Sequence, residues 1–226
     1  MQGTNPAAES REAILRILDL SHVITPGMAQ WPGDDQPLAI HLRSEHGDGT
    51  HMSSALELGC HVGTHIDAPL HFLAGQPGLD ALPIEDFCGR GRLVRLPAGT
   101  AAGPLGPEIL AGNDDSDTDF IIIATGWERY WGTPRYYREW PYLSGELAAE
   151  LARRGLKGIG LDTPSLDDPR GRIAHDICAA AGMINIENLA GLARLPERPF
   201  TFLALPLKLA ATEASPVRAV ALVEET

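Results

Sequence analysis

Cysteine is scarce in this sequence, and its spacing indicates no pairing. The 226 residues include three cysteines, Cys60, Cys88 and Cys178, and no Cys-x-x-Cys motif. An odd number of well-separated cysteines argues against a disulfide framework and against a cysteine-based zinc site. A reducing compartment suits such a chain, so we expect a cytoplasmic protein.

Features that would direct the chain to a membrane or to nucleic acid are also missing. The longest aliphatic run, Ile121 to Ala124, is far too short to cross a bilayer, and the N-terminal stretch MQGTNPAAESRE has no apolar core of the signal-peptide kind. Positively charged residues are fewer than negatively charged ones. The chain has 18 Lys and Arg and 30 Asp and Glu, which gives a formal net charge of -12. Such a surface repels nucleic acids and anionic membranes, so we expect neither as a partner.

The rest of the composition is that of a globular chain, with 44% hydrophobic and 21% charged residues. Alternating or aliphatic runs predict eight strands. They cover residues 38–43, 53–58, 93–96, 120–125, 158–162, 183–186, 200–205 and 217–223. Helical periodicity predicts helices over Ser144–Arg154 and Ala174–Ala181, each followed by a glycine, and a short helix over Pro107–Ala111. Residues 1–10 read as a polar tail, and residues 11–226 as a single α/β domain with mixed sheets.

The stretch 61–71, HVGTHIDAPLH, concentrates chemistry-bearing side chains. It holds three of the eight histidines and one aspartate. With a period of two, His61, His65, Asp67 and His71 fall on one side, and the apolar side chains between them fall on the other. Gly63 and Pro69 interrupt any long regular element, so we expect a strand end that runs into a tight turn.

Imidazole nitrogens and carboxylate oxygens are ligands that Zn²⁺, Mn²⁺ and related ions accept. His61, His65 and Asp67 supply three such donors within seven residues. His71 is either a fourth ligand or a base beside a metal-bound water. The alternative is a histidine-rich turn without chemical use, which is less common for a cluster of this density.

This motif resembles the signature of the metal-dependent cyclase-like amidohydrolase family, which includes kynurenine formamidases and isatin hydrolases. The family pattern, H-x-G-[TA]-H-x-D-x-P-x-H, is matched at every fixed position. Six further landmarks resemble the family in order along the chain. They are Asp19-Leu20-Ser21, Trp31-Pro32-Gly33-Asp34, Thr125-Gly126-Trp127, Asp162-Thr163-Pro164-Ser165, Leu205-Pro206-Leu207-Lys208 and Ser215-Pro216-Val217-Arg218. The resemblance implies a swivelling β/β/α sandwich fold.

The resemblance also implies a metal site. In the family the first two motif histidines and the aspartate hold metal, and a later His and Glu complete a two-metal site in the formamidases. The residues that match the motif ligands are His61, His65 and Asp67, and Asp67 can bridge two ions. The residues that match the later pair are His175 and Glu187. His175 opens a predicted helix and Glu187 ends a predicted strand, so both can reach one pocket. Isatin hydrolases hold one metal and lack the second acidic ligand, so the presence of Glu187 favours two ions of zinc or manganese.

Two further residues receive roles from the resemblance. His71 matches the proton-transfer residue, and an imidazole with an ordinary pKa of ~6.5 suits proton exchange near neutral pH. Trp31 stands where the formamidases contact an aromatic substrate, although it could also serve as packing. The implied reaction is attack by metal-activated water on a polarised amide carbonyl, with His71 delivering the proton to the leaving nitrogen.

Aromatic residues gather in one segment, residues 125–142, which holds all four tyrosines and three of the four tryptophans. Such a cluster predicts either a lid over a pocket or a buried subunit contact. The resemblance implies a homo-oligomer, either a dimer or a tetramer. The stretch RYWGTPRYY looks like the wider family rather than the dedicated kynurenine formamidases, which leaves N-formylkynurenine open as the substrate.

The functional expectation is a metal-dependent hydrolase of the C–N bond in a small aromatic or cyclic amide, such as an arylformamide or a lactam. The alternative is a non-hydrolytic cyclase or dehydratase that uses the same metal as a Lewis acid. A silent binding module would require a missing ligand, and none is missing.

Overall fold

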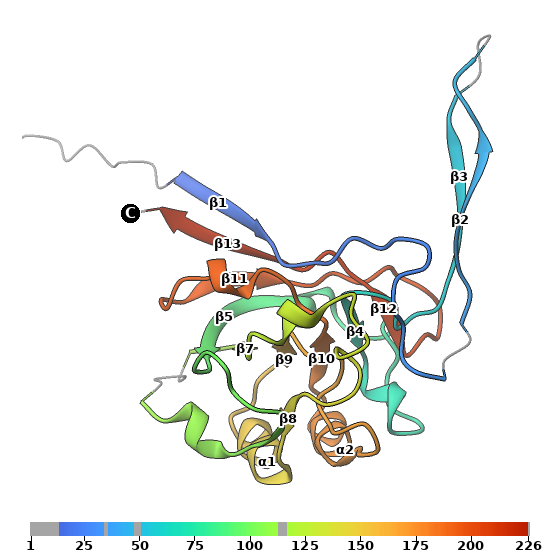
Figure 1. Ribbon diagram of the computed structural model, residues 1–226. Helices are drawn as coiled ribbons and strands as arrows, with labels where there is room; N and C mark the ends of the chain where they lie inside the picture. Colours follow the sequence, from blue (N-terminus) through green and yellow to red (C-terminus); the bar gives the residue numbers. More distant parts are fainter. Residues whose placement is uncertain (1–13, 34–35, 48–50, 113–116, 226) are drawn as a thin grey trace, which may run out of the picture.

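A computed structural model describes residues 14–33, 36–47, 51–112 and 117–225. A nine-stranded sheet forms its centre, in the order β1-β13-β11-β5-β7-β9-β10-β4-β12 (Figure 1). Its strands are β1 (Ile14–Asp19), β4 (His65–Asp67), β5 (Cys88–Arg95), β7 (Phe120–Ala124), β9 (Gly158–Leu161), β10 (Ile184–Glu187), β11 (Phe200–Leu203), β12 (Ala214–Pro216) and β13 (Val220–Glu225). The predicted tail at residues 1–10 lies outside the described residues.

The middle of the sheet is parallel and its two sides are antiparallel. β5, β7, β9 and β10 run parallel to one another. The other strands, β1, β13, β11, β4 and β12, join by antiparallel pairing. Parallel strands are buried on both faces, which is why β7 reads FIIIA and is buried at every position. The expected mixed α/β fold is therefore confirmed.

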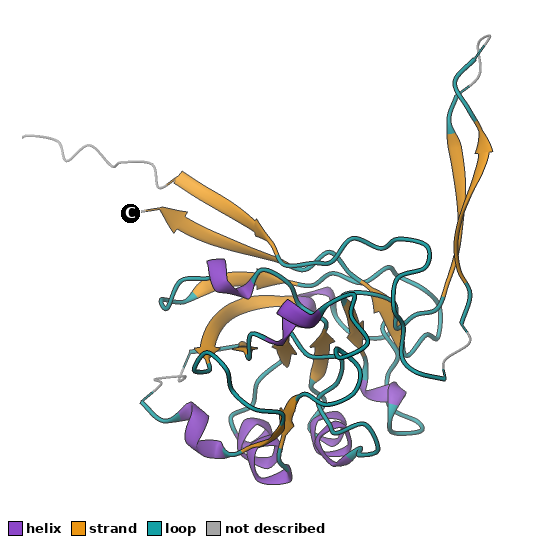
Figure 2. Ribbon diagram, viewed as in Figure 1, coloured by secondary structure: helices purple, strands orange, loops and turns teal. Residues whose placement is uncertain are grey.

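Side chains on the two faces of β7 enter two different cores. Ile121 and Ile123 pack with helices α1 (Gly145–Arg153) and α2 (Ile173–Ala180), which lie below the sheet in Figure 2. Phe120 and Ile122 pack on the other face with residues from β10, β11 and β13. Period-two alternation along a strand thus divides the apolar residues between two layers.

Both predicted helices are present. The hydroxyl of Ser144 accepts a hydrogen bond from the Leu147 amide at 3.1 Å and caps α1, and Gly155 follows the helix with a φ of +69°. Gly182 does the same after α2, with a φ of +74°. The longest of these helices has nine residues, so no helix in the described part of the chain could cross a bilayer. The short helix predicted at residues 107–111 is a 3₁₀ helix over Pro107–Leu110.

A hairpin of β2 (Leu38–Ser44) and β3 (Ser53–Leu58) projects from the body (Figure 1). Its register pairs Leu38 with Leu58 and Ile40 with Leu56, which puts these four side chains on one face of the ribbon. Ile40 is 45% exposed and Leu56 66% exposed. The hairpin therefore presents an uncovered apolar face in the single chain.

The structure adds four strands that the sequence patterns did not predict. They are β1, β6 (Gly103–Leu105), β8 (Pro141–Leu143) and β12, of which β6 and β8 pair with each other. The strand expected at residues 217–223 is β13, which begins three residues later, at Val220. Three of the four additions have only three residues, which is too short for an alternating pattern to stand out.

Candidate metal centre

The pairing of β4 with β10 brings the two halves of the predicted site together. Glu187 lies opposite His65, Ile186 opposite Ile66, and Asn185 opposite Asp67. Ile66 and Ile186 point into the apolar core, so His65 and Glu187 project together from the other face, toward α2. The expected strand end is confirmed as a three-residue strand, His65–Asp67.

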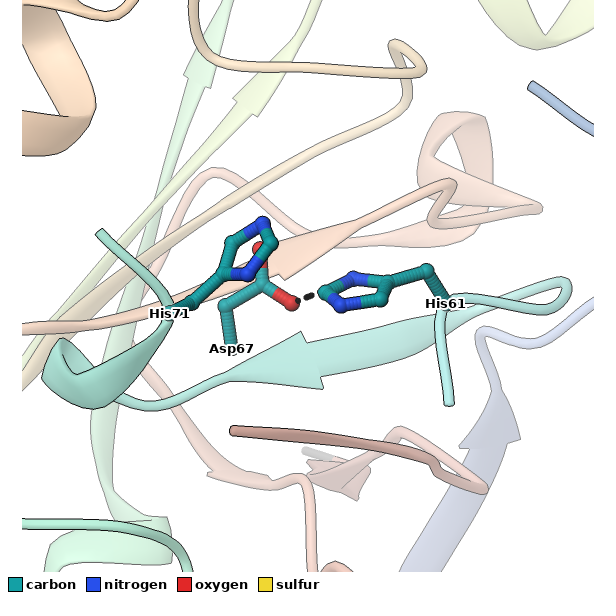
Figure 3. Close-up of side chains that lie close together, drawn as sticks. All are labelled: His61, Asp67 and His71. Carbon is teal, nitrogen blue, oxygen red and sulfur yellow. Dashed lines mark ion pairs between the residues drawn. The ribbon is translucent and has the colours of Figure 1, made fainter. Parts of the chain in front are cut away.

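The turn before β4 carries His61, and the 3₁₀ helix after it, Pro69–His71, carries His71. Gly63 makes the turn possible because its φ is +66°, in the left-handed region. Figure 3 shows His61 and His71 directed toward Asp67 from opposite sides. His61 Nδ1 lies 3.0 Å from Asp67 Oδ1, and the rings of His61 and His71 are 4.2 Å apart.

These three residues form one group with the spacing of metal ligands. One donor atom of each of His61, Asp67 and His71 lies within 4.8 Å of the others. The geometry is therefore compatible with both roles considered for His71, a ligand or a base beside the metal.

A second group shares Asp67 with the first. Donor atoms of His65, Asp67 and Glu187 also lie within 4.8 Å of one another. His65 Nε2 is 3.6 Å from Asp67 Oδ1 and 3.5 Å from Glu187 Oε2. The other ring nitrogen, Nδ1, lies 2.9 Å from the carbonyl of Gly63 and 3.2 Å from the side-chain nitrogen of Asn188. When Nδ1 donates to the Gly63 carbonyl, Nε2 bears the lone pair of the neutral ring.

His175 approaches Glu187 from α2. Its Nε2 lies 3.1 Å from Glu187 Oε1, which also accepts a hydrogen bond from the Leu166 amide at 3.1 Å. Its Nδ1 lies 2.7 Å from Asp167 Oδ2. All five predicted metal ligands thus line one cavity, in an arrangement that extends from His61 through Asp67 and Glu187 to His175.

The charges in this array are strongly coupled. Burial disfavours charged His61 and His175, yet the carboxylates beside them raise the pKa of each to about 9, Asp67 acting on His61 and Asp167 with Glu187 on His175. Burial likewise disfavours an ionised Asp67, but His61 and His65 hold its pKa below its usual value. Burial lowers the pKa of His71, with His61 and His175 adding to the effect. The protein therefore balances buried negative charge with protonated imidazoles.

The donor set suits a divalent cation. Asp67 Oδ1 is fully buried and accepts no hydrogen bond of good geometry from the described residues, despite its nearness to His61. A buried carboxylate oxygen without a hydrogen-bond donor is stabilised by a positive charge beside it, which protonated His61 or a bound cation can supply. Imidazole nitrogens and carboxylate oxygens are donors that divalent transition metals accept.

Aromatic side chains form the walls of the cavity, whose volume is about 310 Å³. Phe72 stacks on His175 with ring centroids 4.1 Å apart. Trp31 lies edge-on to Tyr137, whose hydroxyl donates to the carbonyl of Ala29 at 3.2 Å and so holds the Trp31 loop against the cavity. Trp31 is therefore at the cavity wall, where the prediction of a substrate contact requires it, and it also packs on Trp140.

Asn188 is a structural part of the site that sequence reasoning missed. It is buried with a φ of 57°, an uncommon conformation that asparagine tolerates better than most residues. Its side-chain amide donates to the carbonyl of Gly63 at 2.9 Å, and its own carbonyl accepts from the Thr64 hydroxyl at 2.6 Å. Asn188 thus fastens the motif turn to the end of β10. An asparagine directly after Glu187 was the only signal in the sequence.

The contacts of Tyr136 show the role of one part of the aromatic segment, residues 125–142. Its hydroxyl donates to Asn188 Oδ1 at 2.8 Å and lies 3.1 Å from the carbonyl of Asp162. Trp127, Tyr136 and Trp140 form a core cluster that is buried within the single chain. These three residues are therefore support beneath the site, a role that neither the lid nor the subunit-contact hypothesis anticipated.

Comparison with known proteins gives consistent matches over most of the chain. Residues 18–168 match the model of the family described as "Putative cyclase". A kynurenine formamidase from Salinibacter ruber (strain DSM 13855 / M31) is 30% identical, over 91% of this chain and 97% of the relative.

Solved structures match the fold. Isatin hydrolase A from Labrenzia aggregata superposes with a TM-score of 0.81 at 25% identity, covering 93% of this chain and 94% of that one. A structure described as a predicted metal-dependent hydrolase from Bacillus stearothermophilus has a TM-score of 0.77 at 26% identity, covering 93% of this chain and 99% of that one.

The contact between Tyr136 and Asn188 can be tested by Tyr136→Phe. Loss of the hydroxyl leaves the buried Asn188 Oδ1 without its donor, so we expect the free energy of unfolding to fall by ~1–3 kcal/mol. Urea unfolding would measure the change, with Tyr142→Phe as the control because Tyr142 is only partly buried. Equal effects of the two substitutions would contradict the support role.

Proposed function

Because the chain belongs to the cyclase family, we propose that it is a metal-dependent amidohydrolase that cleaves the C–N bond of a small aromatic or cyclic amide. One observation carries this proposal. The five predicted ligands and His71 line a single cavity that has aromatic walls. The relatives named above are a formamidase and two hydrolases, so hydrolysis is favoured over the cyclase or dehydratase alternative.

We assign the metal to two overlapping positions. His61, His65 and Asp67 would hold one ion, His175 and Glu187 a second, and Asp67 would bridge them. When bound, zinc or manganese polarises a carbonyl oxygen and lowers the pKa of bound water toward ~7. The two groups of donor atoms that share Asp67 support two positions on either side of this carboxylate. They place His61 with His71 and His65 with Glu187, and His175 joins the array through Glu187.

His71 would move the proton. It ends the 3₁₀ helix behind Pro69 and is less buried than His65 or Asp67, so its ring can meet both the ligands and a substrate. The depressed pKa of His71 leaves its ring neutral near pH 7, the form that can accept a proton from water and return it to the leaving nitrogen.

The cavity walls favour a flat, aromatic substrate. Trp31, Phe72 and Tyr137 line the same cavity as the ligands and offer ring faces and edges to an aromatic substrate. A cavity of about 310 Å³ is at the small end of ligand sites. An arylformamide such as N-formylkynurenine and a lactam such as isatin both meet these conditions.

The reaction class can be tested with purified, metal-loaded protein. Elemental analysis should find two ions per chain, and an N-formyl arylamine or the isatin lactam should release a carboxylate in step with loss of the amide. A cyclase or dehydratase would release none. If no amide in such a panel yields a carboxylate with either zinc or manganese, the hydrolase assignment is wrong.

Two alanine variants separate binding from proton transfer. His65→Ala should lose metal and activity together, because His65 lies within the ligand array. His71→Ala should keep most of its metal while turnover falls ~10²–10⁴-fold, the usual contribution of a general acid–base. Metal content and kcat would be measured on both. Loss of metal in His71→Ala equal to that in His65→Ala would make His71 a ligand.

We also propose that the chain forms a homo-oligomer, a dimer or a tetramer, in the cytoplasm. The uncovered apolar face of the β2–β3 hairpin supports assembly, because an isolated two-stranded hairpin is at best marginally stable in water. The three unpaired cysteines support a reducing compartment.

A charge on the hairpin's apolar face tests the assembly. Leu56→Glu should shift the mass measured by light scattering at micromolar concentration toward the monomer. His41→Gln, on the opposite face of the same ribbon, should leave the mass unchanged. A parent protein that is already monomeric would exclude the oligomer.

A further inference from the structure

Asp167 lies next to His175, and both its backbone and its carboxylate make hydrogen bonds. It is 4% exposed, and it precedes α2 in the loop that leads from β9. Its backbone carbonyl accepts a hydrogen bond from the indole of Trp140 at 2.8 Å, and its amide lies 3.3 Å from the hydroxyl of Ser165. These two contacts hold the backbone of Asp167 in place and so fix the position from which its carboxylate projects.

Three N–H groups converge on the two oxygens of this carboxylate. Oδ1 accepts from the Ala174 amide at 2.8 Å. Oδ2 accepts from the His175 amide at 3.0 Å and faces the His175 ring at Nδ1, 2.7 Å away. An ionised carboxylate has no proton to give, so Nδ1 must carry the hydrogen.

A fixed proton on Nδ1 determines what the other nitrogen can do. His175 Nε2 points at Glu187, and in the neutral ring it bears the lone pair. His65 is oriented in the same manner, but its Nδ1 meets the uncharged carbonyl of Gly63. Since a carboxylate partner raises the basicity of the opposite nitrogen more than a carbonyl does, the two imidazoles are unequal donors.

We propose that Asp167 is a positioning residue for the second metal, at the His175–Glu187 position. It holds the His175 ring with the proton on Nδ1, so that Nε2 faces the cation as a more basic donor. This inference rests on the proposed ligand set. Asp167 does not contact the metal in this proposal; it acts through His175.

The same contacts also anchor the first turn of α2, so a structural role must be separated from a positioning role. A structural role affects the fold as a whole, and loss of Asp167 would then weaken both metal positions or neither. A positioning role affects only the position that His175 serves. The two roles therefore differ in the selectivity of the loss.

Asp167→Asn is the decisive variant. It keeps the size of the side chain but replaces one of two oxygens with a donor, so the three N–H groups can no longer all be accepted. Metal-free protein would be titrated with Co²⁺, whose visible spectrum reports each position, and with Zn²⁺ by calorimetry. We expect the affinity of one position to fall roughly 10–100-fold while the other keeps its parent value.

Asp176→Asn is the matched control. Asp176 is on the same helix and is also an aspartate, but it pairs with Arg172 at the surface. It should leave both affinities unchanged. If Asp167→Asn binds two ions as tightly as the parent, or loses both equally, the positioning role is overturned while the proposed ligands stand.

A measurement on the parent protein keeps the test independent of folding in the variant. Nitrogen-15 NMR of labelled histidine in the Zn²⁺-loaded protein should show His175 protonated at Nδ1. Protonation at Nε2 overturns the inference. A parent that binds only one ion overturns both this inference and the assignment of His175 and Glu187 as ligands.

Discussion

The antiparallel pairing of β4 with β10 is the constraint on which the site depends. These strands are far apart in the sequence and only three and four residues long, yet their register decides which side chains share a face. A slip of one residue would turn His65 and Asp67 into the apolar core and Ile66 toward α2. The apolar residues therefore fix the position of the polar ones, because Ile66 and Ile186 can be buried on only one side.

Concentrated buried charge is the consequence of that register. The side chains of Asp67 and Glu187 are 2% and 6% exposed, and those of His65 and His175 are both 4% exposed. Such carboxylates would be costly to bury alone, at several kcal/mol each. Protonated His61 and His175, whose pKa values the neighbouring carboxylates raise, offset this cost in the metal-free protein, and a divalent cation can replace those protons. Protons and metal therefore compete for the same nitrogen lone pairs.

Sequence patterns predicted the parts of this protein that depend on local chemistry. Strand β3 and the capped helix α1 have clear periodicity or a capping serine, and the motif at 61–71 carries its ligands within a few residues. β6 and β8 went unrecognised because they are three residues each and are strands only through their pairing with one another. Asp167 and Asn188 were missed for a related reason. Each acts through partners more than five residues away in the chain, at positions that only the folded sheet and α2 determine. The aromatic segment gave a correct signal of importance, but composition could not distinguish support beneath a site from a cover above it.

The two edges of the large sheet lie at very different distances, counted in strands, from the ligands. At one edge, β1 pairs with β13 so that Ile14 lies opposite Glu225, which puts the two ends of the described chain side by side (Figure 1). At the other edge, β12 pairs directly with β4 and so with the ligands themselves. Strands β11, β5, β7, β9 and β10 lie between this terminal edge and β4, so a structural shift at the edge is five strands away from the ligands. A substitution in β1 is therefore insulated from the ligands by the width of the sheet, whereas one in β12 acts directly on the strand that carries His65 and Asp67.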